Sequence, residues 1–130
     1  MLRRFFIAAA FIAISFSCTD DSTNDDTCID YQLEGVQEVV DVPTLVEGTF
    51  AFEVSFQVDN GCGQFYAFDE QSQGNTRTIR VSTKYEGCIC TQDLPILSRT
   101  YQFAPTLAGT YTLNFVKPDG TFITRTVVKN

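Results

Sequence analysis

The chain of 130 residues contains no histidine and no tryptophan. Histidine is the commonest general base and the commonest nitrogen ligand of metals, so its absence lowers the expectation of an enzyme or a metalloprotein. The sequence also lacks a nucleophile motif, a phosphate-binding loop and any segment with the apolar period of an amphipathic helix. We therefore expect an all-β, non-catalytic protein without a cofactor.

Basic residues are missing from residues 20–47, although nine acidic residues lie there. Residues 49–130 carry seven acidic and seven basic side chains, so this part of the chain is neutral. The net charge of −7 therefore belongs to the N-terminal segment. Since no basic patch is present to meet phosphates, nucleic acid is not an expected partner.

The first 17 residues have the pattern of a secretory signal peptide. Two arginines precede about a dozen mostly apolar residues, too few for a membrane-spanning helix of about 20, and small residues follow. The next stretch, 18–27, is polar and acidic, and it lacks the central glycine and distal glutamate of a calcium-binding EF-hand loop. We predict a signal peptide at 1–17, a disordered acidic tether at 18–27 and one domain at 28–130.

Cys18 directly follows this segment, and Thr19-Asp20-Asp21 comes next. With these features the first 26 residues resemble the precursor of a surface lipoprotein of the Bacteroidetes type, although Ser15 stands where the usual pattern has leucine. The resemblance implies that Cys18 carries acyl chains such as palmitate and becomes the mature N-terminus. Several acyl chains give stable membrane anchoring. The implied location is the outer membrane, with the domain exposed at the cell surface.

Residues 49–58 alternate large apolar and smaller or polar side chains. A period of two predicts a strand with one buried face, and that aromatic face requires a second sheet to cover it. A second clean alternation, at 77–85, directs Ile79, Val81, Thr83 and Tyr85 inward. Short apolar segments separated by turn residues recur along the domain, which predicts an antiparallel β-sandwich of about seven strands. The expected strands are 36–42, 49–58, 62–69, 77–85, 99–103, 110–116 and 121–128.

The segment Gln102-Phe103-Ala104-Pro105, followed by Ala108-Gly109-Thr110-Tyr111-Thr112-Leu113, resembles the late strands of immunoglobulin-like domains. The resemblance implies that the Tyr111 hydroxyl caps a corner of the chain. It does not extend to the immunoglobulin family itself, because the sequence has no tryptophan and Leu113 stands where that family has its second cysteine. The expected fold is therefore an immunoglobulin-like sandwich.

Four cysteines remain besides Cys18, namely Cys28, Cys62, Cys88 and Cys90. An even number of cysteines in an exported chain favours disulfide bonds. A bond between Cys88 and Cys90 would close a ring of poor geometry, so two pairings stay open. We favour Cys62–Cys88 with Cys28–Cys90. A thiolate site for zinc or copper(I) is the alternative, which an oxidising compartment disfavours.

Residues 94–97 form an apolar run, Leu94-Pro95-Ile96-Leu97, between the last cysteine and a strand. Core packing is the favoured interpretation, because exposed apolar patches are uncommon on monomers. The alternative is a rigid recognition loop at 88–97 with Leu94, Pro95 and Ile96 as binding residues. The function we predict is a non-catalytic binding or structural surface module for a protein or glycan ligand. A protease inhibitor of immunoglobulin-like fold that uses loop 88–97 is the alternative.

Overall fold

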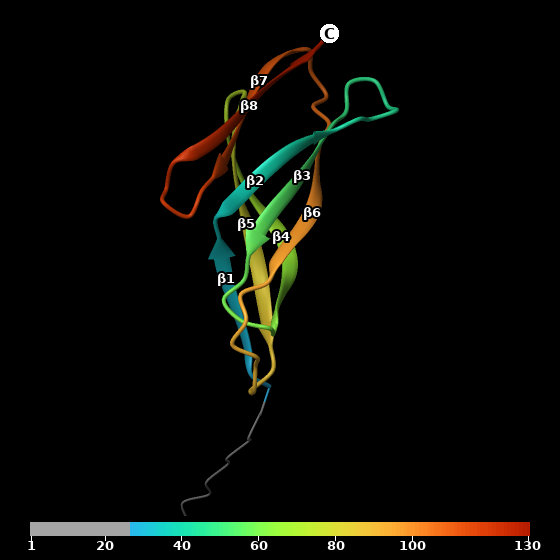
Figure 1. Cartoon of the computed structure of the whole chain (residues 1–130). Helices are drawn as coiled ribbons and strands as arrows, with labels where there is room; N and C mark the ends of the chain where they lie inside the picture. Colours follow the sequence, from blue (N-terminus) through green and yellow to red (C-terminus); the bar gives the residue numbers. More distant parts are fainter. Residues whose placement is uncertain (1–26) are drawn as a thin grey trace, which may run out of the picture.

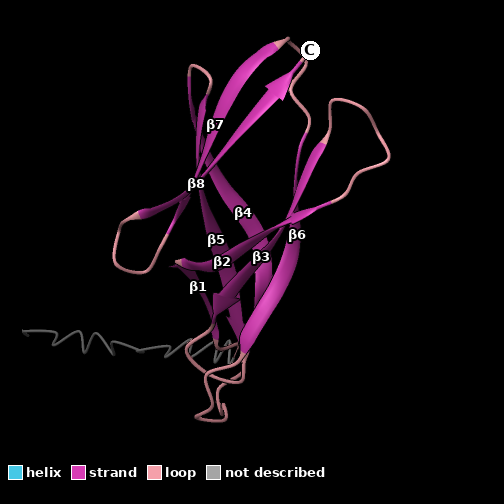
Figure 2. Ribbon diagram, turned by 45° about the horizontal axis from the view of Figure 1, so that its top comes forward, coloured by secondary structure: helices cyan, strands magenta, loops and turns pink. Residues whose placement is uncertain are grey.

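The protein is described here by a computed structural model, which covers residues 27–130. The predicted signal peptide, Cys18 and all but the last residue of the predicted tether lie outside the described residues. Within residues 27–130 the chain forms strands and loops and no helix (Figure 2). The strands are β1 (Ile29–Glu34), β2 (Val36–Val42), β3 (Phe50–Gln57), β4 (Gly63–Gln73), β5 (Thr76–Glu86), β6 (Ile96–Phe103), β7 (Gly109–Val116) and β8 (Phe122–Lys129).

The strands form two sheets, which confirms the predicted β-sandwich. In Figure 1 the three-stranded sheet, ordered β2-β3-β6, lies in front of β4 and β5 of the second sheet. The second sheet has five strands, and β5 pairs with β4 on one side. On its other side β5 pairs with β1 over Val81–Glu86 and with β7 over Thr76–Ile79, and β8 pairs with β7.

Two details differ from the prediction. Residues 27–130 contain eight strands and not about seven, because residues 29–34 form β1 with its larger apolar side chains outward. The pairing of β5 with β7 is parallel, while the other pairs are antiparallel. The chain leaves β5, crosses to the other sheet as β6 and returns as β7, so β7 runs in the direction of β5. A crossover of this kind is the connection that a parallel pair requires.

The alternating segments bury the side chains that they were predicted to bury. Val54 and Phe56 of β3 and Ile79 of β5 are fully buried, as is Phe115 of β7. The ring of Phe115 contacts the rings of Phe52 and Tyr101 edge to face, with centroids 5.8 and 5.6 Å apart. This arrangement is favoured for aromatic pairs, and it joins the two sheets through one aromatic cluster.

The corner before β7 has the predicted tyrosine cap. The hydroxyl of Tyr111 donates a hydrogen bond to the backbone oxygen of Leu107 at 2.8 Å. Gly109 has φ +149°, a conformation that glycine adopts more readily than other residues. The resemblance to immunoglobulin-like domains thus predicted this local structure correctly.

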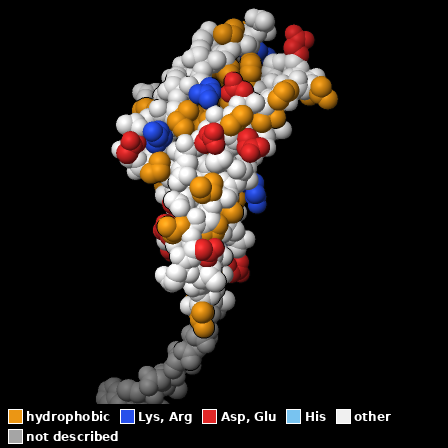
Figure 3. Space-filling model, viewed as in Figure 1, with side chains coloured by type: hydrophobic (Ala, Val, Ile, Leu, Met, Phe, Trp, Pro, Cys, Tyr) orange, Lys and Arg blue, Asp and Glu red, His pale blue; other side chains and the backbone are white. Residues whose placement is uncertain are grey.

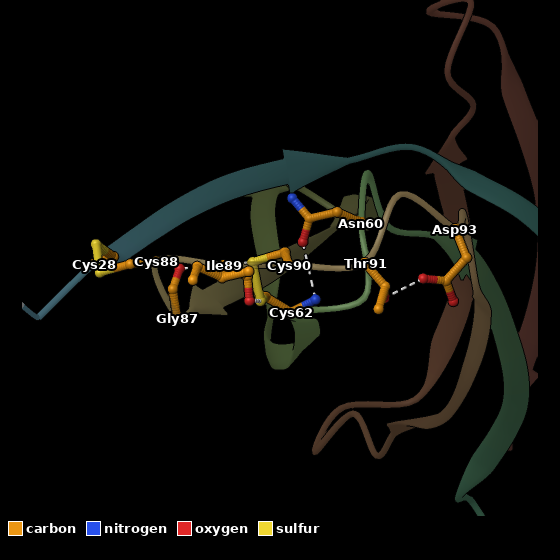
Figure 4. The surroundings of a disulfide bond; sticks show 9 residues. All are labelled: Cys28, Asn60, Cys62, Gly87, Cys88, Ile89, Cys90, Thr91 and Asp93. Atoms are coloured by element: carbon orange, nitrogen blue, oxygen red, sulfur yellow. Dashed lines mark hydrogen bonds between the residues drawn. A yellow bond between two sulfur atoms is a disulfide. The ribbon is translucent and has the colours of Figure 1, made fainter.

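The two ends of the sandwich differ. The described chain begins at the lower end in Figure 1, and the C-terminus lies at the upper end. The lower end also holds the β3–β4 turn and the loop between β5 and β6, where the cysteines lie (Figures 1 and 4). We call it the disulfide end. The loops after β2 and β6 lie at the opposite end.

Alkaline pH is expected to destabilise the domain through Tyr85. The hydroxyl of Tyr85 donates to the Glu34 carboxylate at 2.7 Å and accepts from the backbone nitrogen of Asp59 at 2.8 Å. Burial, assisted by the Glu34 carboxylate, raises the pKa of Tyr85 to about 12. The ordinary value is about 10, so the folded state holds the proton more tightly than the unfolded state.

The stabilising contribution of Tyr85 is therefore complete below pH 10 and is lost as the pH rises from about 10 to 12. A two-unit shift corresponds to about 2–3 kcal/mol of unfolding free energy. Urea unfolding between pH 8 and 12 measures this loss, with Tyr85→Phe as the control. We expect the variant to lose less stability over that range than the wild type. Equal losses in both proteins would show that Tyr85 is not responsible.

Candidate functional site

Two disulfide bonds lie close together at the disulfide end (Figure 4). One joins Cys28 to Cys88, with the Cα atoms 5.0 Å apart. The other joins Cys62 to Cys90, with the Cα atoms 5.4 Å apart. All four cysteines are thus paired, but the favoured pairing, Cys62–Cys88 with Cys28–Cys90, is wrong.

Strand register explains the observed pairing. Ile29 of β1 lies opposite Glu86 of β5, and the Gly87 nitrogen donates to the Cys28 oxygen at 2.9 Å. Cys28 and Cys88 therefore meet at the end of the β1–β5 ladder. The chain then continues toward the β3–β4 turn, where the Gly61 nitrogen donates to the Thr91 oxygen at 3.0 Å. This contact brings Cys90 beside Cys62.

The loop 88–97 is tied to its neighbours by hydrogen bonds as well as by disulfides. The Val58 nitrogen donates to the Pro95 oxygen at 3.0 Å, and the Gln57 side chain donates to the Leu94 oxygen at 3.1 Å. The side chains of Leu94 and Ile96 are nevertheless 56% and 62% exposed. Core packing is thus the wrong interpretation for both residues. Of the apolar run, Leu97 is the residue that packs against the core.

Ile89 is the most exposed apolar residue of this loop, at 95%. It lies between the two cystine bridges (Figure 4). The loop therefore presents Ile89, Leu94 and Ile96 from a backbone that two covalent bonds hold in place. The loop thus offers an exposed apolar surface.

A second candidate surface, which sequence reasoning missed, lies on the outer face of the five-stranded sheet. Tyr31 of β1 and Tyr66 of β4 are 52% and 57% exposed, and their rings meet edge to face with centroids 4.9 Å apart. The ladder breaks register between Phe65 and Ala67, so Tyr66 is the extra residue of a β-bulge. Bulges commonly redirect a side chain in this way.

Lys84 of β5 lies between the two tyrosine-bearing strands. Its register partners are Tyr31 on β1 and Gln64 on β4. The amine pairs with the Glu86 carboxylate at 2.9 Å, and this hydrogen bond raises the pKa of Lys84. The lysine is therefore positively charged at neutral pH and already paired.

Farther along the same face lies a hollow of about 150 Å³, lined by Leu33, Asp69, Gln71, Thr78 and Arg80. Register places Asp69 opposite Arg80 and Gln71 opposite Thr78. A second hollow of about 140 Å³, beside the β7–β8 turn, shares Leu33 and Arg80 with the first. Gly35 also lines this second hollow. A Cβ atom on residue 35 would lie 2.3 Å from the Pro118 nitrogen, so the close approach of the two backbones requires glycine.

The polar side chains of the first hollow have no partners of their own. Among residues 27–130, the side chains of Asp69, Gln71, Thr78 and Arg80 make no hydrogen bond or ion pair. Some other charged residues are paired within the fold. Glu70, for example, accepts from the Tyr101 hydroxyl at 2.9 Å and pairs with Arg77 at 3.4 Å.

Two further findings concern residues 27–130. No group of three or more histidine, cysteine, aspartate or glutamate side chains is arranged there to hold a metal ion. That part of the chain also contains no helix long and apolar enough to cross a membrane.

Comparison with known proteins identifies the domain type. No curated protein and no solved structure matches the chain. A family model, described as the ORF11 beta-sandwich domain, matches residues 52–128. This range runs from β3 into β8 and covers more than half of the chain. The chain therefore belongs to the ORF11 beta-sandwich domain family.

Proposed function

We propose that the chain is a lipid-anchored cell-envelope protein of the bacterial outer membrane, whose sandwich acts as a non-catalytic binding or structural module at the cell surface. The observation that carries the proposal is the pair of disulfide bonds, because such bonds persist in exported proteins and are rare in the cytosol. The signal-peptide pattern at 1–17, followed by Cys18, supports export from a separate part of the sequence.

The place where the chain enters the domain fits the role of a surface module. Cys28 begins the folded part at the disulfide end, ten residues after Cys18. Ten extended residues span up to about 30 Å. A lipid on Cys18 would hold the disulfide end toward the membrane, and the opposite end and both outer sheet faces would remain accessible.

The direct test compares detergent-phase partitioning of the exported full chain with that of Cys18→Ser. The wild type is expected in the detergent phase, because acyl chains dominate its partitioning. The Cys18→Ser protein is expected in the aqueous phase, and Ser22→Ala, in the same acidic segment, should behave as the wild type. A wild-type protein in the aqueous phase, or measurable turnover of a substrate by the purified protein, would contradict the proposal.

A protease inhibitor that uses loop 88–97 is the second candidate. It is supported by the exposure of Leu94 and Ile96 on a loop held by two disulfides, since a pre-organised loop loses less entropy on binding. A panel of serine and cysteine proteases tests it. Inhibition that is lost in Leu94→Asp and retained in Leu107→Asp, at the opposite end, would favour this function. Full protease activity at high protein concentration would exclude it for that panel.

A further inference from the structure

We propose that the outer face of the five-stranded sheet is a binding site for a neutral oligosaccharide, an inference that rests on the proposed role of the domain as a binding module. The site is a track along β1, β5 and β4. It begins at the Tyr31–Tyr66 pair and ends in the hollow beside Asp69 and Arg80. We call it the tyrosine track.

The track is continuous along the strands. Lys84 lies beside Tyr31, and Arg80 lies on the same face of β5, four residues before Lys84. Four residues of strand span about 13 Å. Leu33, on the same face of β1 as Tyr31, lies between the tyrosine pair and the hollow and lines it. The length suits an extended ligand of several units better than a single small molecule.

The polar groups of the hollow match the chemistry of a polyhydroxylated ligand. A sugar hydroxyl both donates and accepts hydrogen bonds, so its site needs acceptors and donors side by side. Asp69 supplies acceptors, Arg80 supplies donors, and Gln71 and Thr78 supply both. Because none of these side chains has a partner within residues 27–130, a ligand would not have to break existing bonds.

The aromatic pair supplies the apolar part of the site. A pyranose ring carries C–H groups on its faces as well as hydroxyls at its edge, and the flat face of a tyrosine ring covers such a surface. Tyr31 and Tyr66 hold one another edge to face, so little conformational freedom is lost when a ligand binds. Tyrosine also combines an apolar ring with a polar hydroxyl, which suits a surface of mixed character.

The charges of the track favour a ligand without net charge. Asp69 opposes Arg80, and Lys84 is paired with Glu86, so the positive and negative charges balance. An anionic polymer would meet Asp69 and Glu86 as well as the bases. An extended peptide would be expected to add to the edge of a sheet through its backbone, and not to lie on the face.

The outer face of the three-stranded sheet offers a contrast. Two pairs of its polar side chains bond to one another: Ser55 to Ser98 at 2.9 Å, and Gln37 to Gln57 at 3.2 Å. On the side seen in Figure 3, acidic, basic and apolar side chains are interspersed. Because no exposed aromatic pair lies on this face within residues 27–130, it serves as the control surface.

Affinity electrophoresis of the full chain, in a detergent without a sugar headgroup, tests the proposal. The probes are four neutral polysaccharides (a β-glucan, an α-glucan, a galactomannan and a xyloglucan), with heparin, polygalacturonate and gelatin as the anionic and protein comparisons. We expect retardation by at least one neutral polysaccharide. The Tyr31→Ala/Tyr66→Ala protein should bind it at least about tenfold more weakly, and Asp69→Asn several-fold more weakly.

Control variants decide whether such a loss is local. Val40→Ala, on the outer face of the three-stranded sheet, and Leu107→Ala, at the opposite end, should bind as the wild type. Equal thermal unfolding of all variants shows that they are folded. The proposal is overturned if no neutral polysaccharide retards the wild type, if only heparin, polygalacturonate or gelatin does, or if the double tyrosine variant binds normally.

Chemical labelling gives a second readout that does not depend on a variant. Tyr31 and Tyr66 are exposed, while Tyr85, Tyr101 and Tyr111 are 6%, 3% and 5% exposed. N-acetylimidazole should therefore acetylate the first two, and the retarding polysaccharide should protect them. Acetylation of both at an unchanged rate in its presence would contradict the site.

The two proposals can fail separately. A chain that partitions into detergent through Cys18 and binds no neutral polysaccharide would retain the proposed surface role and lose the tyrosine track. A chain that is not lipidated, or that turns over a substrate, would contradict the proposed function whatever it binds.

Discussion

Replacing Phe115 with alanine is expected to lower the free energy of unfolding by about 3–5 kcal/mol. Phe115 is fully buried in β7, and its ring contacts Phe52 of the facing sheet and Tyr101. Truncation removes the apolar surface of the ring and leaves a cavity between the sheets. Urea unfolding followed by circular dichroism measures the loss.

Phe122→Ala is the matched control, because this phenylalanine belongs to the same β7–β8 hairpin and is 53% exposed. We expect a change of less than about 1 kcal/mol, as at most surface positions. A similar loss of stability in the two variants would show that Phe115 is not at the centre of the core.

Removal of either disulfide is the second large effect. The Cys28–Cys88 bond spans 60 residues and the Cys62–Cys90 bond spans 28. The entropy of the loops closed in the unfolded chain predicts contributions of about 4 and about 3.5 kcal/mol. Cys28→Ser/Cys88→Ser and Cys62→Ser/Cys90→Ser should each lose about that much stability, and neither should contain a free thiol in its folded domain.

Cys28→Ser/Cys90→Ser is the control for the pairing. It breaks both observed bonds at once and leaves Cys62 and Cys88 without their partners. We expect two thiols that react with iodoacetamide and a larger loss of stability than in either matched pair. If this variant has no reactive thiol and is the most stable of the three, the pairing in the structure is contradicted.

Side-chain alternation was enough to predict most of the fold. In β3 and β5 the buried face could be predicted because large apolar side chains alternate with smaller or polar ones over most of each strand. Turn residues, such as Asn60-Gly61 and Pro118-Asp119-Gly120, separate the apolar segments of the sequence. These signals are local, so they predict strands and turns without knowledge of which strands are neighbours in a sheet.

The missed features depend on contacts between distant segments. β1 carries Tyr31 and Leu33 outward and Glu34 inward, where its carboxylate accepts from Tyr85, so its apolar side chains do not mark the buried face. The disulfide pairing follows from the register of β1 against β5, which no local pattern specifies. The start of β6 at Ile96, and not at Arg99, likewise follows from its pairing with Gln57.

The residues of the candidate site could likewise be predicted only in part from local sequence. Leu94 and Ile96 were identified as an apolar run, but their exposure is a property of the folded loop. Tyr31 and Tyr66 are 35 positions apart in the sequence. Their rings meet because β1 and β4 flank the same strand, β5, and because a bulge turns Tyr66 outward. The alternation of residues 29–34 was the one signal in the sequence that could have drawn attention to this face.

We propose a lipid-anchored sandwich whose chain enters the domain beside two disulfide bonds. The most direct test is the intact mass of the membrane-extracted protein after alkylation without reduction, followed by partial reduction and differential labelling. We expect a lipid adduct on Cys18, no alkylated thiol, and labels that appear in pairs on Cys28 with Cys88 and on Cys62 with Cys90. An unlipidated chain with four reactive thiols would contradict the proposal.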